Sequence, residues 1–242
     1  MEYEERVRQE LLDWKKKLEK RSSIFERTSK NFQDKLQVFV PEKADHAITI
    51  GIKKMVEMTL AGSMAITRTK DPGKKPLQER DQSARNLISF FQKTAALEGA
   101  GTGGAGFWLG AADFPLLLGL QMKYLFETAE AYGYATKEKS ERVFLLYVFH
   151  LAYAEEKDRK MLLEKIENWD VNPAQMNEID WKSFQKAYRD HIDFVKMLQL
   201  LPGFGTIVGG VANHHLITRL GSFAMNAFRL RMLNNEEMEK KR

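Results

Sequence analysis

The chain has 242 residues, no cysteine and a formal net charge of +5, and 43% of its residues are hydrophobic. That apolar content can bury a core without disulfides, and the lack of cysteine excludes thiol nucleophiles, CxxC redox chemistry and cysteine zinc sites. The mild positive charge favours anionic partners. No nucleic-acid motif accompanies it, and the two signs of charge are interspersed, so we expect no nucleic-acid binding. The lack of cysteine, and charged residues where a secretory signal would have its apolar core, predict a cytoplasmic protein.

The first predicted helix has Val7, Leu11, Trp14 and Leu18 at helical spacing. Pro41 ends this region and is well placed to open a second helix, whose apolar stripe runs from Ile48 through Gly62 to Ile66. Residues 67–77 form a basic loop rich in proline and glycine, which we expect to be exposed.

Further helices are predicted beyond this loop, with Thr136 and Asp180 as two of their N-caps. They cover residues 84–95, 116–132, 136–154, 158–169, 181–201 and 206–233. The charged tail, residues 234–242, is expected to fray. No stretch as long as a β-strand alternates apolar and polar residues with period two. The sequence therefore predicts an all-α, multi-helix bundle that spans residues 1–242 as a single domain.

Two glycine-rich segments, residues 99–120 and 200–213, interrupt the ordinary pattern. The first reaches the length of a transmembrane helix. However, Asp113, Pro115 and its glycines predict two short helices that meet at a bend, with Asp113 capping the second. Small residues four apart let helices approach closely. Two interpretations stay open for these residues, helix packing or contact with a membrane or membrane protein: Gly99, Gly103, Gly106, Phe107, Trp108, Gly110, Pro115, Gly205 and Gly209.

No catalytic or metal-binding motif is present in the sequence. Two GxGxxG matches, which begin at Gly99 and Gly101, follow a predicted helix where dinucleotide binding needs a strand. We expect no cofactor and no metal. Of the adjacent His214 and His215, we expect one to face the interior and the other to face the solvent. The weak candidates for a hidden catalytic centre are polar residues in or beside the glycine segments: Glu98, Asp113, Asn213 and His214.

The two glycine segments resemble the EcsC family of bacterial proteins. The resemblance rests on residues 95–103, on Asp113-Phe114-Pro115 with the leucines that follow, and on residues 201–213, and it extends over nearly the whole chain. It implies an association with the Ecs ABC transporter, alongside whose subunits the member that names the family is encoded. It implies no catalytic residues.

Composition, motifs and resemblance together favour a non-enzymatic accessory protein on the cytoplasmic face of the membrane. Its expected partners are transporter subunits or another membrane protein, and anionic lipid. The alternatives are a hydrolase that acts on lipids or peptides, and a carrier of lipids or hydrophobic peptides.

Overall fold

A computed structural model describes residues 2–19, 42–62, 75–103, 114–154, 156–171 and 205–240. Backbone alone is described for residues 19, 42–49, 98–103, 114–116 and 205–213. Within these ranges the chain is all-helical, as predicted, and contains no strand. The helices are α1 (Glu2–Glu19), α3 (Glu42–Ala61), α4 (Leu77–Gly103), α6 (Phe114–Tyr132), α7 (Lys139–Tyr153), α8 (Glu156–Glu167) and α10 (Gly205–Lys240).

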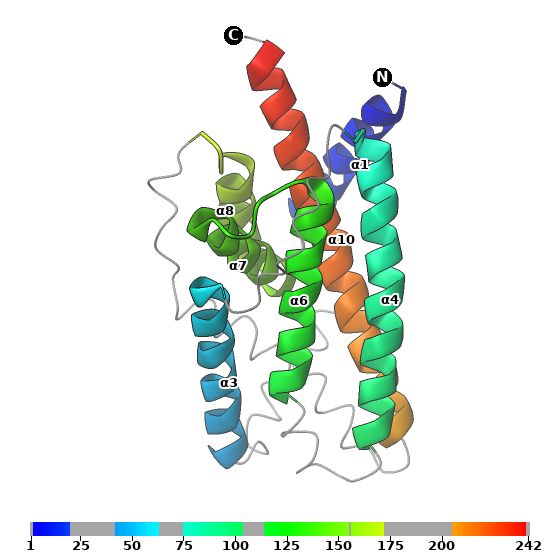
Figure 1. Cartoon of the computed structure of the whole chain (residues 1–242), viewed down its shortest axis with the longest axis vertical. Helices are drawn as coiled ribbons and strands as arrows, with labels where there is room; N and C mark the ends of the chain where they lie inside the picture. Colours follow the sequence, from blue (N-terminus) through cyan, green and yellow to red (C-terminus); the bar gives the residue numbers. More distant parts are fainter. Residues whose placement is uncertain are drawn as a thin grey trace.

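The long helices α4, α6 and α10 run side by side along the molecule, and α3 packs against α6 and α7 (Figure 1). Helices α1, α7 and α8 lie toward the end that carries both chain termini. We call this the terminal end. The opposite end, where α4 stops at Gly103 and α6 and α10 begin, is called the glycine end (Figure 1).

Helices α4 and α10 form an antiparallel pair whose register is fixed by side-chain contacts. Arg229 bonds Asp81 near the terminal end, and Gln92 bonds Thr218 nearer the middle. Each step forward on α4 therefore corresponds to a step backward on α10. Continued to the glycine end, this register brings the last turns of α4, residues 99–103, level with the first turns of α10. The helical parts of the two glycine-rich segments thus lie at the same end of the molecule.

The core is built around α7, which is buried from Val143 through Tyr153. Its continuous apolar run explains this burial, because a helix that is hydrophobic all round is covered on every side. The ring of Phe228 on α10 contacts aromatic rings from α6, from α7 and from the turn between them. It stacks on Tyr132 at 5.2 Å and on Tyr134 at 5.4 Å between ring centroids, and lies 5.3 Å from Phe144.

Arginines from neighbouring elements bind the carbonyl groups that helix ends leave without partners. Arg142 Nε donates to the carbonyl of Leu60 at 3.1 Å, and Arg80 donates to the carbonyl of Tyr132. At the same end of α3, Gly62 adopts a φ of +74°, which favours glycine. The helix therefore stops at Ala61, whereas the apolar stripe predicted a continuation to Ile66.

Two other local predictions differ from the structure. Thr136 does not cap α7, because its hydroxyl donates to Glu130 Oε1 at 3.0 Å, and the helix begins after Glu138 without a side-chain cap. The tail expected to fray from residue 234 is helical to Lys240. Asn234 Nδ2 donates to the Glu167 carbonyl at 3.1 Å, which anchors this last part of α10 to the end of α8.

Several predictions fall outside the described residues. They include the loop over residues 67–74, the helix over residues 181–201 and the bend between residues 104 and 113. Helix α6 begins at Phe114 with Pro115 in its first turn, a position where the missing amide hydrogen is tolerated.

Candidate functional site

Three of the four catalytic candidates lie on helices near the glycine end. Glu98 lies on α4 and Asn213 on α10, both with undescribed side chains, while Asp113 lies outside the described residues. The side chain of His214 is described and exposed, and its Nδ1 lies 3.5 Å from Thr218 Oγ1. Whether the four residues form one site therefore stays a prediction.

The two adjacent histidines differ from expectation. His214 and His215 are both exposed, and their rings meet edge to face with centroids 5.9 Å apart. The prediction that one of them faces the interior is wrong. This part of α10 is embedded on the side that carries Leu216 and Ile217, and both imidazoles lie beyond the edges of that buried side.

A buried polar network links α1, α4, α6 and α10 near the terminal end. Asp81 is fully buried and accepts hydrogen bonds from the hydroxyls of Tyr3, at 2.6 Å, and Tyr132. Arg229 Nε donates to Asp81 Oδ2 at 2.9 Å, and its Nη1 donates to Glu10 at 3.1 Å. Burial, and then the negative charge of Asp81, raises the pKa of Tyr132 above its usual range. The network is satisfied from within, so it stabilises the fold.

A second network lies on the opposite side of α10. Arg231 makes two bonds to Glu141, at 2.5 and 2.7 Å, and two to Asp170, at 2.7 and 2.6 Å. Its guanidinium also lies 4.1 Å from the ring centroid of Tyr134. Only the planar guanidinium group of arginine can bind two carboxylates in a bidentate way and also lie against an aromatic ring. Two residues apart, Arg229 and Arg231 fasten α10 to α4 on one side and to α7 on the other.

Among the glycines whose surroundings are described, Gly221 has the tightest contact, and the sequence analysis did not single it out. A Cβ at this position would lie 2.7 Å from Ile88 Cγ1 and 3.2 Å from the Tyr124 hydroxyl oxygen. A larger side chain here would have to displace Ile88 or separate α10 from α4. An isolated glycine inside a helical pattern is a known signal for such a contact, so this position could have been found. The predicted packing glycines Gly99, Gly103, Gly205 and Gly209 lie where the backbone alone is described, and Gly106 and Gly110 lie outside the described residues.

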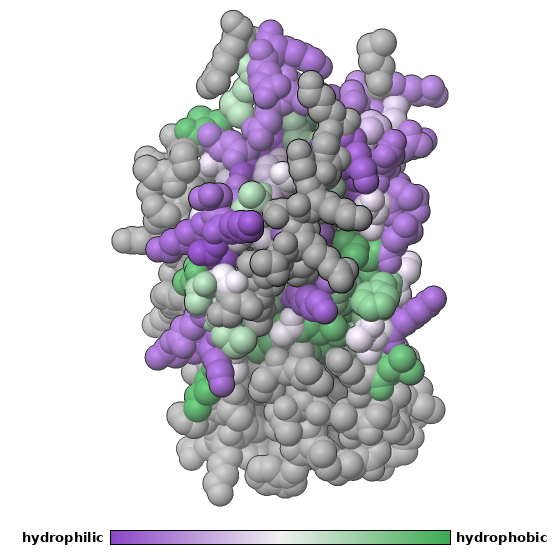
Figure 2. All heavy atoms as spheres, viewed as in Figure 1, coloured by the Kyte–Doolittle hydropathy of each residue, from purple (hydrophilic) through white to green (hydrophobic). Residues whose placement is uncertain are grey.

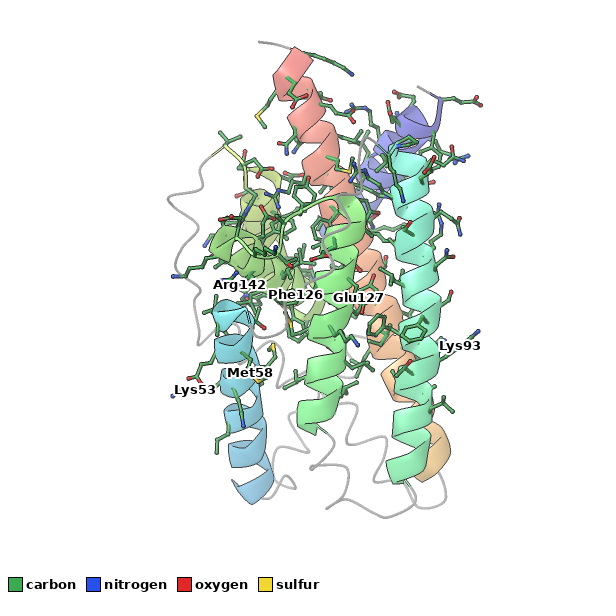
Figure 3. The ribbon with its side chains drawn as sticks, in the orientation of Figure 1. Lys53, Met58, Lys93, Phe126, Glu127 and Arg142 are labelled. Carbon is green, nitrogen blue, oxygen red and sulfur yellow. The ribbon has the colours of Figure 1, made fainter. Side chains whose placement is uncertain are left out.

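The outer side of α4 near the glycine end is apolar and basic. Phe90 is 60% exposed and Leu97 74% exposed, and Lys93 is exposed one turn from each of them. Because residues 90, 93 and 97 share a helix face, they form one surface, which we call the α4 face. Lys93 extends from it away from the bundle (Figure 3).

Acidic residues are sparse around the α4 face, where Glu98 directly follows Leu97. Residues 83–97 of α4 and residues 205–235 of α10 contain no aspartate or glutamate. Figure 2 shows hydrophilic side chains gathered over the terminal end and hydrophobic ones along the α4 side nearer the glycine end. The α4 face therefore attracts anions and offers apolar side chains at the same place.

Within the described ranges, no helix is long and apolar enough to cross a bilayer. The same residues contain no group of three His, Asp or Glu side chains that could hold a metal ion.

Taken together, the fold and its surface define an all-helical protein with satisfied polar networks inside and a basic, partly apolar face outside. The chain belongs to the EcsC protein family, whose family model matches residues 5–233. It is 47% identical to Protein EcsC of Bacillus subtilis (strain 168) over 225 residues, which cover 93% of this chain and 94% of that protein. It is also 30% identical over 167 residues to the uncharacterized protein YdbA of the same organism, with 67% and 61% coverage. No solved structure matches the chain.

Proposed function

We propose that the chain is a non-enzymatic accessory protein that binds peripherally to the cytoplasmic face of the cell membrane and acts there with an ABC transporter. The observation that carries the proposal is the α4 face, where Phe90 and Leu97 are exposed on either side of Lys93. Two large apolar side chains exposed together are costly in water, and an anionic lipid surface complements both their apolarity and the lysine.

The energies fit a reversible association. Full burial of a phenylalanine or leucine side chain stabilises by about 1.5–3 kcal/mol, and a lysine near an anionic surface contributes about 1 kcal/mol. Phe90, Lys93 and Leu97 together therefore supply about 4–7 kcal/mol before the entropic cost of binding. That magnitude suits an interfacial protein that can leave the membrane, and it is far below that of a spanning helix.

The transporter partner is supported by membership in the EcsC family and by the resemblance described above. Binding to the lipid surface would hold the chain beside the membrane subunits and leave the terminal end free for a protein contact. Co-purification with the Ecs ATPase and membrane subunits after mild detergent extraction tests this part. Recovery of both subunits with wild-type chain but not with the resin alone supports it, and recovery of neither overturns it.

The membrane part is tested by cosedimentation with vesicles of phosphatidylglycerol and phosphatidylcholine, compared with phosphatidylcholine alone. The variant Phe90→Ser/Leu97→Ser should bind the anionic vesicles at least about tenfold more weakly than wild type, since both anchors are lost. The matched control is Leu12→Ser/Met161→Ser, which removes two apolar side chains of similar exposure from α1 and α8.

The control variant should bind as wild type does. Equal weakening by both variants, or wild-type binding that does not depend on the anionic lipid, would contradict the proposal. The same samples should be assayed for released fatty acid and phosphate. Release by the wild-type chain that a still-folded Asp113→Ala variant lacks would favour the hydrolase instead.

A further inference from the structure

Three helices reach the glycine end almost without charge. The last ten residues of α4, the first nine of α6 and the first nine of α10 contain one ionisable residue among them, Glu98. The other residues there are apolar or small, with a few threonines and amides. Charged residues are otherwise frequent in this chain, at 29%, so their near absence from three adjacent helix ends is a feature of this end alone among the described helices.

The first exposed basic or histidine residues of α4, α6 and α10 lie at similar distances from the described ends of their helices. They are Lys93 on α4, Lys123 on α6, and His214 and His215 on α10. At 1.5 Å per residue, each of these residues stands about 14–15 Å along its helix from the end at Gly103, Phe114 or Gly205. We call this set the basic belt. On each of these three helices it marks the place where the uncharged end stops.

The hydrocarbon core of a bilayer is about 30 Å thick, so one leaflet contributes about 15 Å. The uncharged length of α4, α6 and α10 matches that depth, and the basic belt would then lie among the lipid headgroups, where lysines bind anionic lipid. We infer that the glycine end enters one leaflet of an anionic bilayer end-on, to a depth set by the basic belt. The inference rests on the proposed membrane binding and specifies its geometry.

Helix α3 sets the tilt of the molecule. Its first turn contains Glu42, Lys43 and Asp45, and charges of this kind are expensive in hydrocarbon. The first turn of α3 therefore stays at headgroup level. The α4 side, which lies across the molecule from α3 (Figures 1 and 3), enters more deeply. This tilt brings Phe90, one turn above Lys93, to the interface.

The first experiment measures depth along α4. Because the chain has no cysteine, single-cysteine variants at exposed positions can be labelled with an environment-sensitive fluorophore and quenched by lipids brominated at known depths. The positions are Leu97, Ser89 and Gln82, which lie on one side of α4 at increasing distance from the glycine end. We expect Leu97 in the hydrocarbon, Ser89 at headgroup level and Gln82 in water, with Ile50 on α3 shallower than Leu97.

The second experiment tests the belt by charge. Lys93→Gln/Lys123→Gln should weaken partitioning into phosphatidylglycerol vesicles by about 25-fold, at roughly fivefold for each lysine. The control variant Lys157→Gln/Lys160→Gln on α8 makes the same change of net charge at the terminal end. It should change the partitioning into these vesicles less than twofold. Glu98→Gln should strengthen partitioning several-fold, whereas Glu79→Gln, at the other end of the same helix, should not.

The outcomes separate this inference from the proposed function. If the wild-type chain binds no vesicle, membrane binding itself is wrong. If it binds with equal depths at Leu97, Ser89 and Gln82, the chain lies on its side and the end-on geometry is overturned while membrane binding stands. If light scattering shows a dimer of the 28.0 kDa chain in which Leu97 is shielded, and this dimer persists with vesicles, the glycine end is an interface between copies and the inference is wrong.

Discussion

The contact between α4 and α10 at Gly221 makes a prediction that can be worked out atom by atom. In Gly221→Ala the new methyl carbon would lie 2.7 Å from Ile88 Cγ1 and 2.8 Å from Ile88 Cδ1. Both distances are far inside the usual separation of nonbonded carbons, about 3.5–4.0 Å. Either the isoleucine must leave its rotamer or the two helices must separate.

Overpacking of this kind costs about 1–3 kcal/mol, while the change from glycine to alanine inside a helix stabilises by about 1 kcal/mol. We therefore expect Gly221→Ala to be destabilised by about 1 kcal/mol, which lowers the melting temperature by roughly 2–4 °C in a chain of this size. Gly119→Ala on α6 is the matched control, because a Cβ there meets no described atom within 4 Å. This control should be stabilised.

A double-mutant cycle identifies the cause. Ile88→Ala removes both crowded carbons, so Gly221→Ala made in that background should raise the melting temperature, with a coupling energy of about 1–2 kcal/mol. Thermal and urea unfolding followed by circular dichroism measure all four proteins. If Gly221→Ala stabilises the wild-type background as much as Gly119→Ala does, the close approach of α4 and α10 described above is refuted.

Two further predictions concern the buried polar groups. Asp81→Asn should lower the free energy of unfolding by about 3–5 kcal/mol, because it leaves Arg229 buried beside a neutral group; urea unfolding measures this, and a loss below 1 kcal/mol would contradict the buried ion pair. Burial raises the pKa of four tyrosine side chains above the usual value near 10: Tyr124, Tyr132, Tyr134 and Tyr153. Above pH 10 the unfolded chain therefore releases their protons while the folded chain keeps them. The stability that these side chains contribute is complete below pH 10 and is lost as the pH rises further. Absorbance at 295 nm should show these four of the seven tyrosines ionising together with unfolding, and four independent titrations near pH 10 in the folded chain would disprove their burial.

Features set by local periodicity could be predicted from the sequence. The spacing of Val7, Leu11 and Leu18 predicts α1, and these three residues are buried. The stripe through Ile52, Met55 and Thr59 is likewise the buried side of α3. Each of these patterns depends only on neighbours along one helix, which is why sequence alone was sufficient.

Features set by contacts between distant segments could not be predicted in the same way. The tail after residue 233 is polar and predicts fraying, but Arg8 pairs with Glu237 and Asn235 donates to Asp170 at 2.8 Å. Threonine is a common N-cap residue, but the Thr136 hydroxyl donates a hydrogen bond to Glu130 instead. The α4 face was also missed, because Phe90 and Leu97 become informative only when their exposure is known. The roles of Glu98, Asp113 and Asn213 remain predictions.

The paired arginines of α10 have a mechanical consequence. Rotation of this helix about its axis, or a slide by one residue, would break a buried ion pair at Arg229, at Arg231 or at both. The helix is therefore locked against screw motion near one end, and its 36 residues extend about 54 Å to the other. A rotation or slide of α10 near this end would therefore also displace its ion-pair partners on α1, α4 and α7.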